Sequence, residues 1–159
     1  FKLPLPLINE KNCHFSFAGL KSAVANVVAE NKCTEKFKKD MSASFQKTIN
    51  KIIFAKTKNA IREYKKVIKP KNNLKIVVAG GVAANKSIQN TLEKLGELEN
   101  CEFLFPSIKY CTDNGAMIAY AGIERFERKK FNKLNFKPRP RWPLDKNAIF
   151  MKGKRPIEG

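Results

Sequence analysis

Apolar residues recur at intervals of three and four through the middle of the chain, starting after Thr34 and stopping at Pro70. A threonine in front of such a series can cap a helix, and a proline cannot continue one. The spacing predicts one long helix between these residues, or two helices joined near the middle. Its apolar positions are Phe37, Met41, Phe45, Ile49, Ile52, Ile53, Ala60, Ile61, Tyr64 and Ile68.

Shorter segments complete an α/β pattern. Residues 20–28, 84–98 and 116–126 have helical spacing, whereas residues 74–79 and 101–105 indicate buried strands and residues 14–17 indicate a further short strand. The order strand, two glycines, helix and strand over residues 74–105 normally produces a parallel pair. Periodicity is lost past residue 130, so we expect a folded part over 1–130 and a basic, proline-containing tail over 131–159.

Composition narrows the class of protein. With 43% apolar residues, including 12 Phe, the 159-residue chain can bury a core, which excludes global disorder. No apolar run is long enough to span a bilayer and no secretion signal is present, so we expect a soluble, cytoplasmic protein without membrane contact. Because the chain opens on Phe1 rather than Met, we expect it to be part of a longer product.

The formal charge of +18 favours polyanionic partners such as RNA or DNA. A merely solvated lysine-rich surface is the alternative, and no RRM, KH or zinc-finger signature supplies a way of reading sequence. The cysteines Cys13, Cys33, Cys101 and Cys111 form no C-x-x-C pair, which indicates four free thiols. With His14 as the one histidine, the chain cannot complete a metal site built on several imidazoles.

Two turns carry candidate chemistry. Gly80 and Gly81 lie between a predicted strand and a helix, where backbone N–H groups can approach a phosphate. A tight strand-to-helix turn explains the same glycines equally well. Asn85 at the head of the helix can cap it or can offer its amide to a ligand. Asp113 likewise suits a helix cap or a divalent-metal ligand, but one carboxylate does not hold a metal, so any co-ligands lie outside this chain.

Four motifs in order resemble one family. Residues 14–24 (HFSFAGLKSAV) resemble the F-S-F-S-G-L-K-T-A element of the TsaD family of tRNA adenosine threonylcarbamoyltransferases, formerly described as glycoproteases. Residues 77–85 (VVAGGVAAN) and 111–119 (CTDNGAMIA) are similar to that family's V-V-A-G-G-V-A-A-N and C-T-D-N-x-A-M-I-A. Residues 139–144 (RPRWPL) are similar to the ending of bacterial members. The family has Ser or Thr where Ala18 and Ser22 stand.

The resemblance implies the C-terminal lobe of an actin-like ATPase (ASKHA) fold, with a mixed sheet flanked by helices. It implies that Asn85 contacts the substrate threonylcarbamoyl-AMP and that Gly80 and Gly81 line the nucleotide cleft. Asp113 would be a ligand of one divalent metal, iron or zinc, whose remaining ligands belong to the N-terminal part of the family fold. No counterpart of the H-x-x-x-H metal pair of that part is present in this sequence.

The implied activity is an acyl transfer in tRNA modification. The adenosine amine next to the anticodon would attack the carbamoyl carbonyl of threonylcarbamoyl-AMP and release AMP, with TsaB-type and TsaE-type proteins as partners. No residue suggests itself as a general base, and we expect this portion to be inactive alone. The alternatives are a non-catalytic remnant that binds RNA or partner proteins, and a sugar kinase or chaperone-like ATPase, which fits the Gly-Gly turn but not the residues around Asp113.

Overall fold

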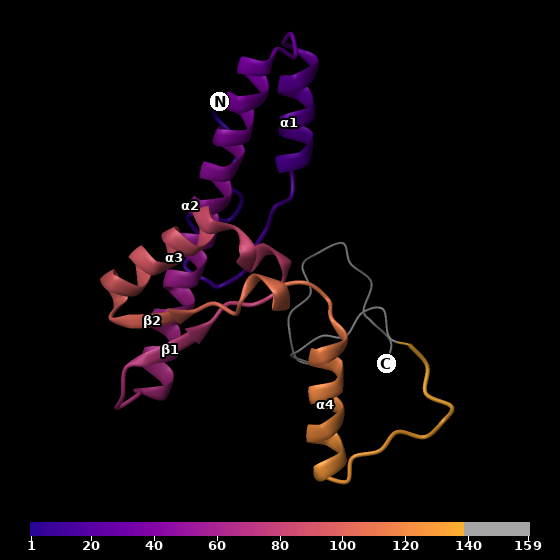
Figure 1. The fold of residues 1–159 in the computed structure, drawn as a ribbon. Coiled ribbons are helices and arrows are strands. Elements are labelled where there is room, and N and C mark those ends of the chain that lie inside the picture. The colour runs from indigo at the N-terminus through magenta and orange to yellow at the C-terminus, as the bar shows by residue number, and fades with distance from the viewer. Residues whose placement is uncertain (139–159) are drawn as a thin grey trace. The chain divides into compact units, whose positions relative to one another are not determined.

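The computed structural model describes residues 1–138 and separates into two units, residues 1–114 and residues 115–159 (Figure 1). The motif over residues 139–144 lies outside the described residues. The expected division at residue 130 between a folded part and a tail stays a prediction.

The first unit opens with an extended segment and a helical hairpin. Helix α1 spans Leu20–Ala29, and α2 spans Glu35–Ile68 as one unbroken helix of 34 residues, which settles the choice between one helix and two. Thr34 caps α2 as predicted, because its hydroxyl oxygen accepts a hydrogen bond from the Phe37 N–H at 3.1 Å. At the other end Lys69 takes the left-handed conformation directly before Pro70.

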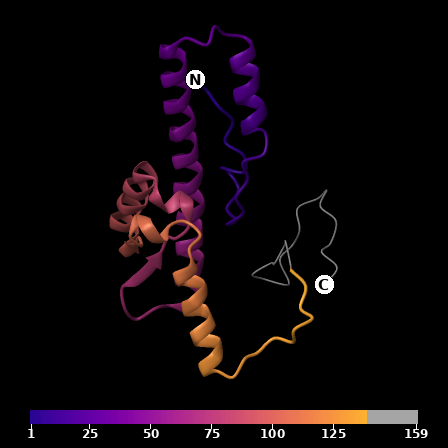
Figure 2. The same cartoon turned by 45° about the vertical axis from the view of Figure 1, so that its right-hand side comes forward.

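α1 lies alongside the first part of α2, and one apolar cluster holds the two helices and the opening segment together (Figure 2). From the opening segment Leu3 is buried, and Leu5 and Ile8 pack against the same cluster. Its buried members are Leu3, Leu20, Phe37, Met41 and Ile52. The opening segment is therefore part of the core of this unit.

Residues 14–17 do not form the strand that the sequence predicts. A strand exists only where a neighbouring strand accepts and donates its backbone hydrogen bonds. The two strands of the described residues pair with each other, and neither pairs with residues 14–17. The segment instead runs as irregular backbone into the turn at Gly19, where φ is 80°.

The second half of the unit is the expected strand–helix–strand arrangement. β1 (Leu74–Val77) pairs in parallel with β2 (Cys101–Leu104), and α3 (Lys86–Glu99) connects them after a short 3₁₀ helix, η1 (Gly81–Ala84). The register joins Leu74 to Cys101 and Val77 to Leu104. The α/β class is thus confirmed, and the sheet within the described residues is a parallel pair where we had expected a mixed sheet.

One face of this pair is covered and the other is open. Ile76 and Phe103 point toward the helices, where they pack against a second apolar cluster that α2, α3 and β2 share. The buried members of that cluster are Ile61, Ile88, Leu92, Leu95 and Cys101. On the opposite face Val77 is 69% exposed, and Lys75 forms an ion pair with Glu102 at 3.6 Å.

Gly96 sets how closely α3 approaches β2. A Cβ atom on this glycine would lie 2.6 Å from the carbonyl oxygen of Cys101 and 3.2 Å from the Phe103 ring. Such a contact with backbone is far inside normal van der Waals distance, so no larger residue fits without moving the strand away from the helix.

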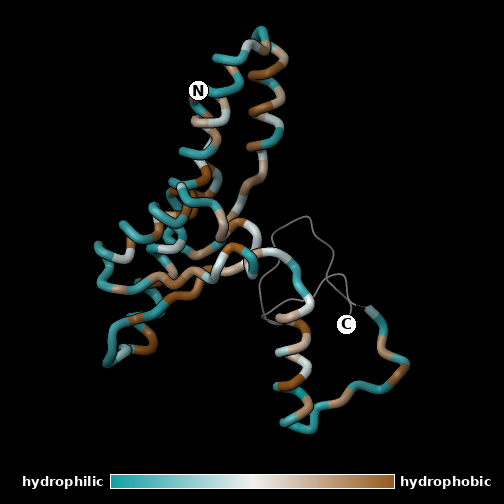
Figure 3. Tube along the Cα trace, viewed as in Figure 1, coloured by the Kyte–Doolittle hydropathy of each residue, from teal (hydrophilic) through white to brown (hydrophobic). Residues whose placement is uncertain are grey.

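The second unit contains one described helix, α4 (Gly115–Glu127), which confirms the helix predicted over residues 116–126. None of its side chains is buried, and apolar residues are interspersed with polar ones along it (Figure 3). Near the end of α4, the ring of Phe126 meets that of Phe131 edge to face, with centroids 5.9 Å apart. Among residues 1–138 no helix has both the length and the apolar content that crossing a bilayer requires.

We expect Gly96→Ala to lower the thermal midpoint of the purified protein, although alanine is the better helix former. The clash with Cys101 should cost about 1–3 kcal/mol, which exceeds the ~1 kcal/mol that alanine gains over glycine in a helix. Gly122→Ala in α4 is the matched control, since its Cβ meets no atom within 4 Å. Circular dichroism melts measure both variants, and a Gly96→Ala midpoint at or above that of the wild type would contradict this account.

Candidate functional site at the carboxyl edge of the sheet

Both candidate turns leave the same edge of the sheet. Because β1 and β2 are parallel, their carboxyl ends lie side by side, and the Val78 N–H extends the pairing by donating to the Leu104 carbonyl at 2.9 Å. The chain then enters the glycine turn after β1 and the loop that leads to Asp113 after β2. A Cβ on Gly81 would lie 3.9 Å from the Cys111 carbonyl oxygen, so the two loops are in contact.

The two glycines differ in why they are needed. Gly80 has φ of 90° and ψ of 173°, a combination that is almost restricted to glycine. Gly81 does not have a positive φ, and a Cβ there would make only an ordinary contact. Neither the backbone conformation nor packing within the described residues therefore requires glycine at position 81. Both glycines are exposed, which leaves their backbone open to close approach by a ligand.

Asn85 caps the N-terminus of α3, which is one of the two roles that the sequence suggested for it. Its Oδ1 accepts hydrogen bonds from the N–H groups of Ser87 at 3.0 Å and Ile88 at 3.2 Å. Its Nδ2 donates to Gln46 Oε1 on α2 at 2.9 Å. Two N–H donors already occupy the oxygen, so one hydrogen on Nδ2 is what the amide has left to give a ligand.

Gln46 belongs to a ring of polar side chains that the sequence did not indicate. Its Nε2 donates to Asn50 Oδ1 at 2.8 Å, and Asn50 Nδ2 in turn donates to Ser87 Oγ at 2.8 Å. These hydrogen bonds connect α2 to the start of α3 and hold the Asn85 side chain on its α2 side. The available signal was the spacing of four between Gln46 and Asn50, which places two amides on one face of a helix.

The Asp113 turn is anchored by the buried Cys111. The Cys111 thiol lies 3.7 Å from the Pro106 carbonyl oxygen and 3.8 Å from that of Ser107, which closes the loop after β2. Asp113, two residues further on, is exposed, and Asn114 Nδ2 donates to the Thr112 carbonyl at 2.9 Å. The turns of Asn85 and Asp113 thus share an edge, whereas a common pocket for the two side chains stays a prediction.

Asp113 is at most one ligand of the metal that the resemblance implies. Residues 1–138 contain no group of three His, Cys, Asp or Glu side chains that could surround an ion. A stable site for a divalent ion needs several such donors. The described donor set therefore does not fit a metal centre by itself.

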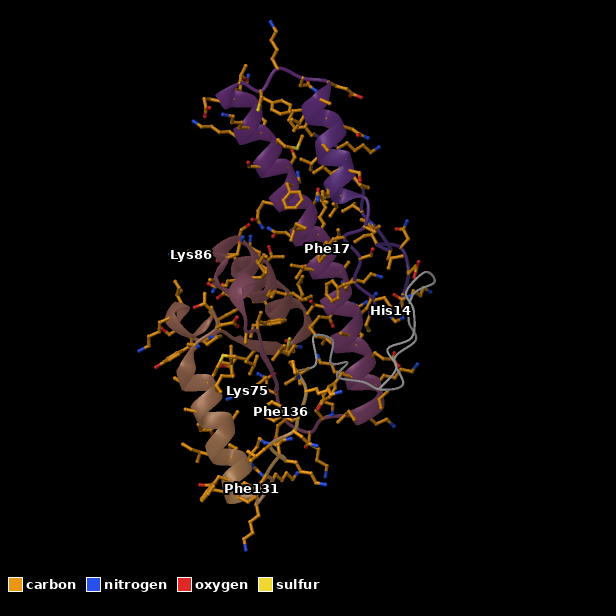
Figure 4. All side chains as sticks on the ribbon, turned by 90° about the vertical axis from the view of Figure 1, so that its right-hand side faces the viewer. His14, Phe17, Lys75, Lys86, Phe131 and Phe136 are labelled. Carbon is orange, nitrogen blue, oxygen red and sulfur yellow. The ribbon has the colours of Figure 1, made fainter. Side chains whose placement is uncertain are left out.

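The first sequence motif also reaches this region. Phe15 and Phe17, on the segment before α1 that carries the His14 and Phe17 labels in Figure 4, line a cavity of about 470 Å³. Ala79 and Val82 of the glycine turn line the same cavity. Two motifs that are more than 60 residues apart in the sequence therefore contribute to one apolar space, next to the turn that carries Asn85.

The four cysteines are free thiols, as the sequence predicted. Burial raises the pKa of the Cys101 thiol, and nearby Lys65 opposes that rise. A thiol with a raised pKa is protonated at neutral pH and is a poor nucleophile. Cys101 is therefore a core residue at the start of β2, away from the carboxyl edge.

Comparison with known proteins follows the same residues. Residues 1–120 match the TsaD family, described as tRNA N6-adenosine threonylcarbamoyltransferase. The chain is 48% identical over 153 residues to a protein of that name from Pelagibacter ubique, which covers 96% of this chain and 42% of the relative. It is 44% identical over 146 residues to one from Rickettsia rickettsii and 41% identical to one from Rickettsia bellii, each over 91% of this chain.

The chain spans about 42% of the length of these relatives. The match extends over the glycine turn, the Asp113 turn and the segment before α1, which are the parts that the structure brings together. This chain belongs to the tRNA N6-adenosine threonylcarbamoyltransferase family, of which it carries a portion.

Proposed function

We propose that this chain is the C-terminal portion of an enzyme that transfers a threonylcarbamoyl group from threonylcarbamoyl-AMP to an adenosine of tRNA. The observation that supports it best is the contact between the glycine turn and the Cys111 loop at the carboxyl edge of the sheet. Ligands of α/β proteins bind beyond the carboxyl ends of parallel strands. Family membership supplies the reaction, and this edge supplies a place for the nucleotide.

The finer fold proposal is the C-terminal lobe of an actin-like ATPase. Its support is the strand, glycine turn and helix over residues 74–99, whose parallel partner β2 follows at once. The nucleotide would then lie across the glycine turn, with the N-terminal part of the family fold on its other side. This division assigns the adenylate half of the reaction to the present chain.

In this proposal Asn85 donates one hydrogen bond to an oxygen of the adenylate. Its amide oxygen is occupied by two backbone N–H groups, so it cannot accept from the ligand. The remaining Nδ2 hydrogen suits a phosphate or carbonyl oxygen, both of which are acceptors. The exposed Gly80 and Gly81 allow the phosphate to approach the backbone without meeting a side chain.

The chemical step joins the adenosine amine to the carbamoyl carbon. The nitrogen forms a bond to that carbon and gives up one proton to water, the bond from the carbon to the phosphate oxygen breaks, and AMP leaves with the electron pair. Holding the adenylate still relative to the tRNA base supplies much of the rate enhancement in such transfers. The contribution of these residues is therefore positioning, through one amide donor and the open backbone of the turn.

Further partners of the proposed enzyme are tRNA, the N-terminal part of the fold and the metal. The charge of +18 attracts the tRNA backbone, with an affinity that falls as salt rises. Asp113 would offer one carboxylate to an iron or zinc ion whose other ligands come from outside this chain. TsaB-type and TsaE-type proteins are the proposed protein partners, and the cytoplasm is the proposed compartment.

We expect Asn85→Ser and Asn85→Ala to separate capping from ligand contact. Serine caps nearly as well as asparagine, whereas alanine should cost about 1 kcal/mol of stability. Both remove the amide donor, so both should weaken threonylcarbamoyl-AMP binding about tenfold to a hundredfold. Calorimetric titration and thermal melts of the full-length protein measure the two effects. Wild-type affinity in Asn85→Ser would leave Asn85 as a cap and nothing more.

We expect Asp113→Asn to reduce the metal content of the full-length protein, since a neutral amide is a weaker ligand than a carboxylate. Losing a group that only orients a metal ligand typically reduces metal affinity by about 10- to 100-fold, so loss of a ligand should reduce it at least as much. Mass spectrometry of the purified protein gives the metal per chain, and Glu127→Gln, an exposed carboxylate on α4, is the control. Equal metal content in Asp113→Asn and wild type would remove Asp113 from the ligand set.

A further inference from the structure

Lys56 is the most deeply buried charged residue in the described part of the chain. Its side chain, in the middle of α2, has no exposure to solvent. It occupies the apolar side of the helix, four residues after the fully buried Ile52. None of the ion pairs among residues 1–138 includes it. A buried ammonium without a carboxylate is unfavourable unless other acceptors surround it.

Those acceptors all come from one short loop. The Lys56 ammonium donates to the Glu10 carbonyl at 2.8 Å, to the Asn12 carbonyl at 3.3 Å and to Asn12 Oδ1 at 3.4 Å. Asn59, one turn further along α2, donates from Nδ2 to the same two carbonyls at 3.3 and 3.0 Å. Two side chains of α2 therefore hold the backbone of residues 10–12.

The contact continues directly into the first sequence motif. Asn12 Oδ1, which accepts from Lys56, also accepts from the backbone N–H of His14 at 3.1 Å. One residue later the chain reaches Phe15, and then Phe17, which line the 470 Å³ cavity together with Val82 of the glycine turn. The neighbouring residue Thr57 lines the cavity from α2. Lys56 thus connects α2, which forms one wall of the cavity, to the loop of residues 10–12, which leads to Phe15 and Phe17 in another wall.

We propose that Lys56 is a positioning residue, whose ammonium fixes residues 10–14 so that Phe15 and Phe17 are held over the glycine turn. This inference rests on the proposed function, because the turn is where the adenylate would bind. A methionine or leucine would fill the same space without the burden of an ion, so packing alone does not explain a lysine here. A lysine ammonium adds directed hydrogen bonds to residues 10–12, a segment that pairs with neither of the two described strands.

The experiment uses the full-length protein and compares Lys56→Met with Lys66→Met, an exposed lysine of the same helix. Lys56→Met should raise the KM for threonylcarbamoyl-AMP about tenfold while the KM for tRNA stays within about twofold. Amide hydrogen exchange over residues 13–17 should accelerate in the same variant. Lys66→Met should match the wild type in all three measurements. Unchanged KM values in a folded Lys56→Met protein, or equal losses for both substrates, would overturn the proposal.

Two further variants keep the test decisive. If Lys56→Met does not fold, Asn12→Ala removes the oxygen that Lys56 shares with His14, together with the Nδ2 that donates to Glu10 Oε2 at 2.6 Å, and leaves both backbone acceptors of Lys56 in place. It should shift the same KM in the same direction to a smaller extent. A double-mutant cycle of Lys56→Met with Phe15→Ala should be non-additive in that KM, since the first change acts through the second residue. Additive effects would assign Lys56 to general stability and reject its positioning role.

Failure of the proposed function is separable from failure of this inference. A wild-type protein that neither binds threonylcarbamoyl-AMP nor transfers the group would refute the proposed function. Hydrogen exchange over residues 13–17 would then decide about Lys56, since that measurement needs no substrate. Equal exchange in Lys56→Met and wild type refutes the positioning role, and faster exchange supports it.

Discussion

Two parallel strands can pair only if the chain between them returns to the edge from which it started, and α3 makes that return in 14 residues. The helix α3 lies close to the sheet because Gly96 leaves room for the backbone of Cys101. Everything at the carboxyl edge follows from this pairing. It places the end of β1 beside the end of β2, so the glycine turn and the Cys111 loop meet although some 30 residues of sequence separate them.

Local signals were enough to predict most elements. The long helix, its Thr34 cap, the short helices and the parallel pair each depend on patterns of neighbouring residues, and all are present. The strand predicted for residues 14–17 is wrong because a strand needs a pairing partner, and a local sequence pattern does not show whether such a partner exists. The mixed sheet was implied by the family resemblance and not by a local pattern, and it requires strands beyond the two that the described residues provide.

The two turns of the candidate site could be predicted from the sequence, but the side chains of α2 that hold the surrounding segments in place could not. Gly80, Asn85 and Asp113 could be proposed as site residues because glycine, amide and carboxylate groups at the ends of strands have few local roles, and their functional assignment stays a prediction. Gln46, Asn50 and Lys56 were not found, since each lies in a helix where polar residues are usually solvated. Their importance comes from contacts with residues about 40 positions away, which appear only once the chain is folded.

The sheet within the described residues has two strands, so each of them is an edge. Along each outer side runs a row of backbone N–H and C=O groups, and Val77 presents apolar surface beside it. Such edges can pair with an extended peptide, whether from the same polypeptide or from another copy. Handled alone at high concentration, this portion of the protein would therefore self-associate by adding strands, and a charged substitution at Val77 would be the natural means of keeping it dispersed.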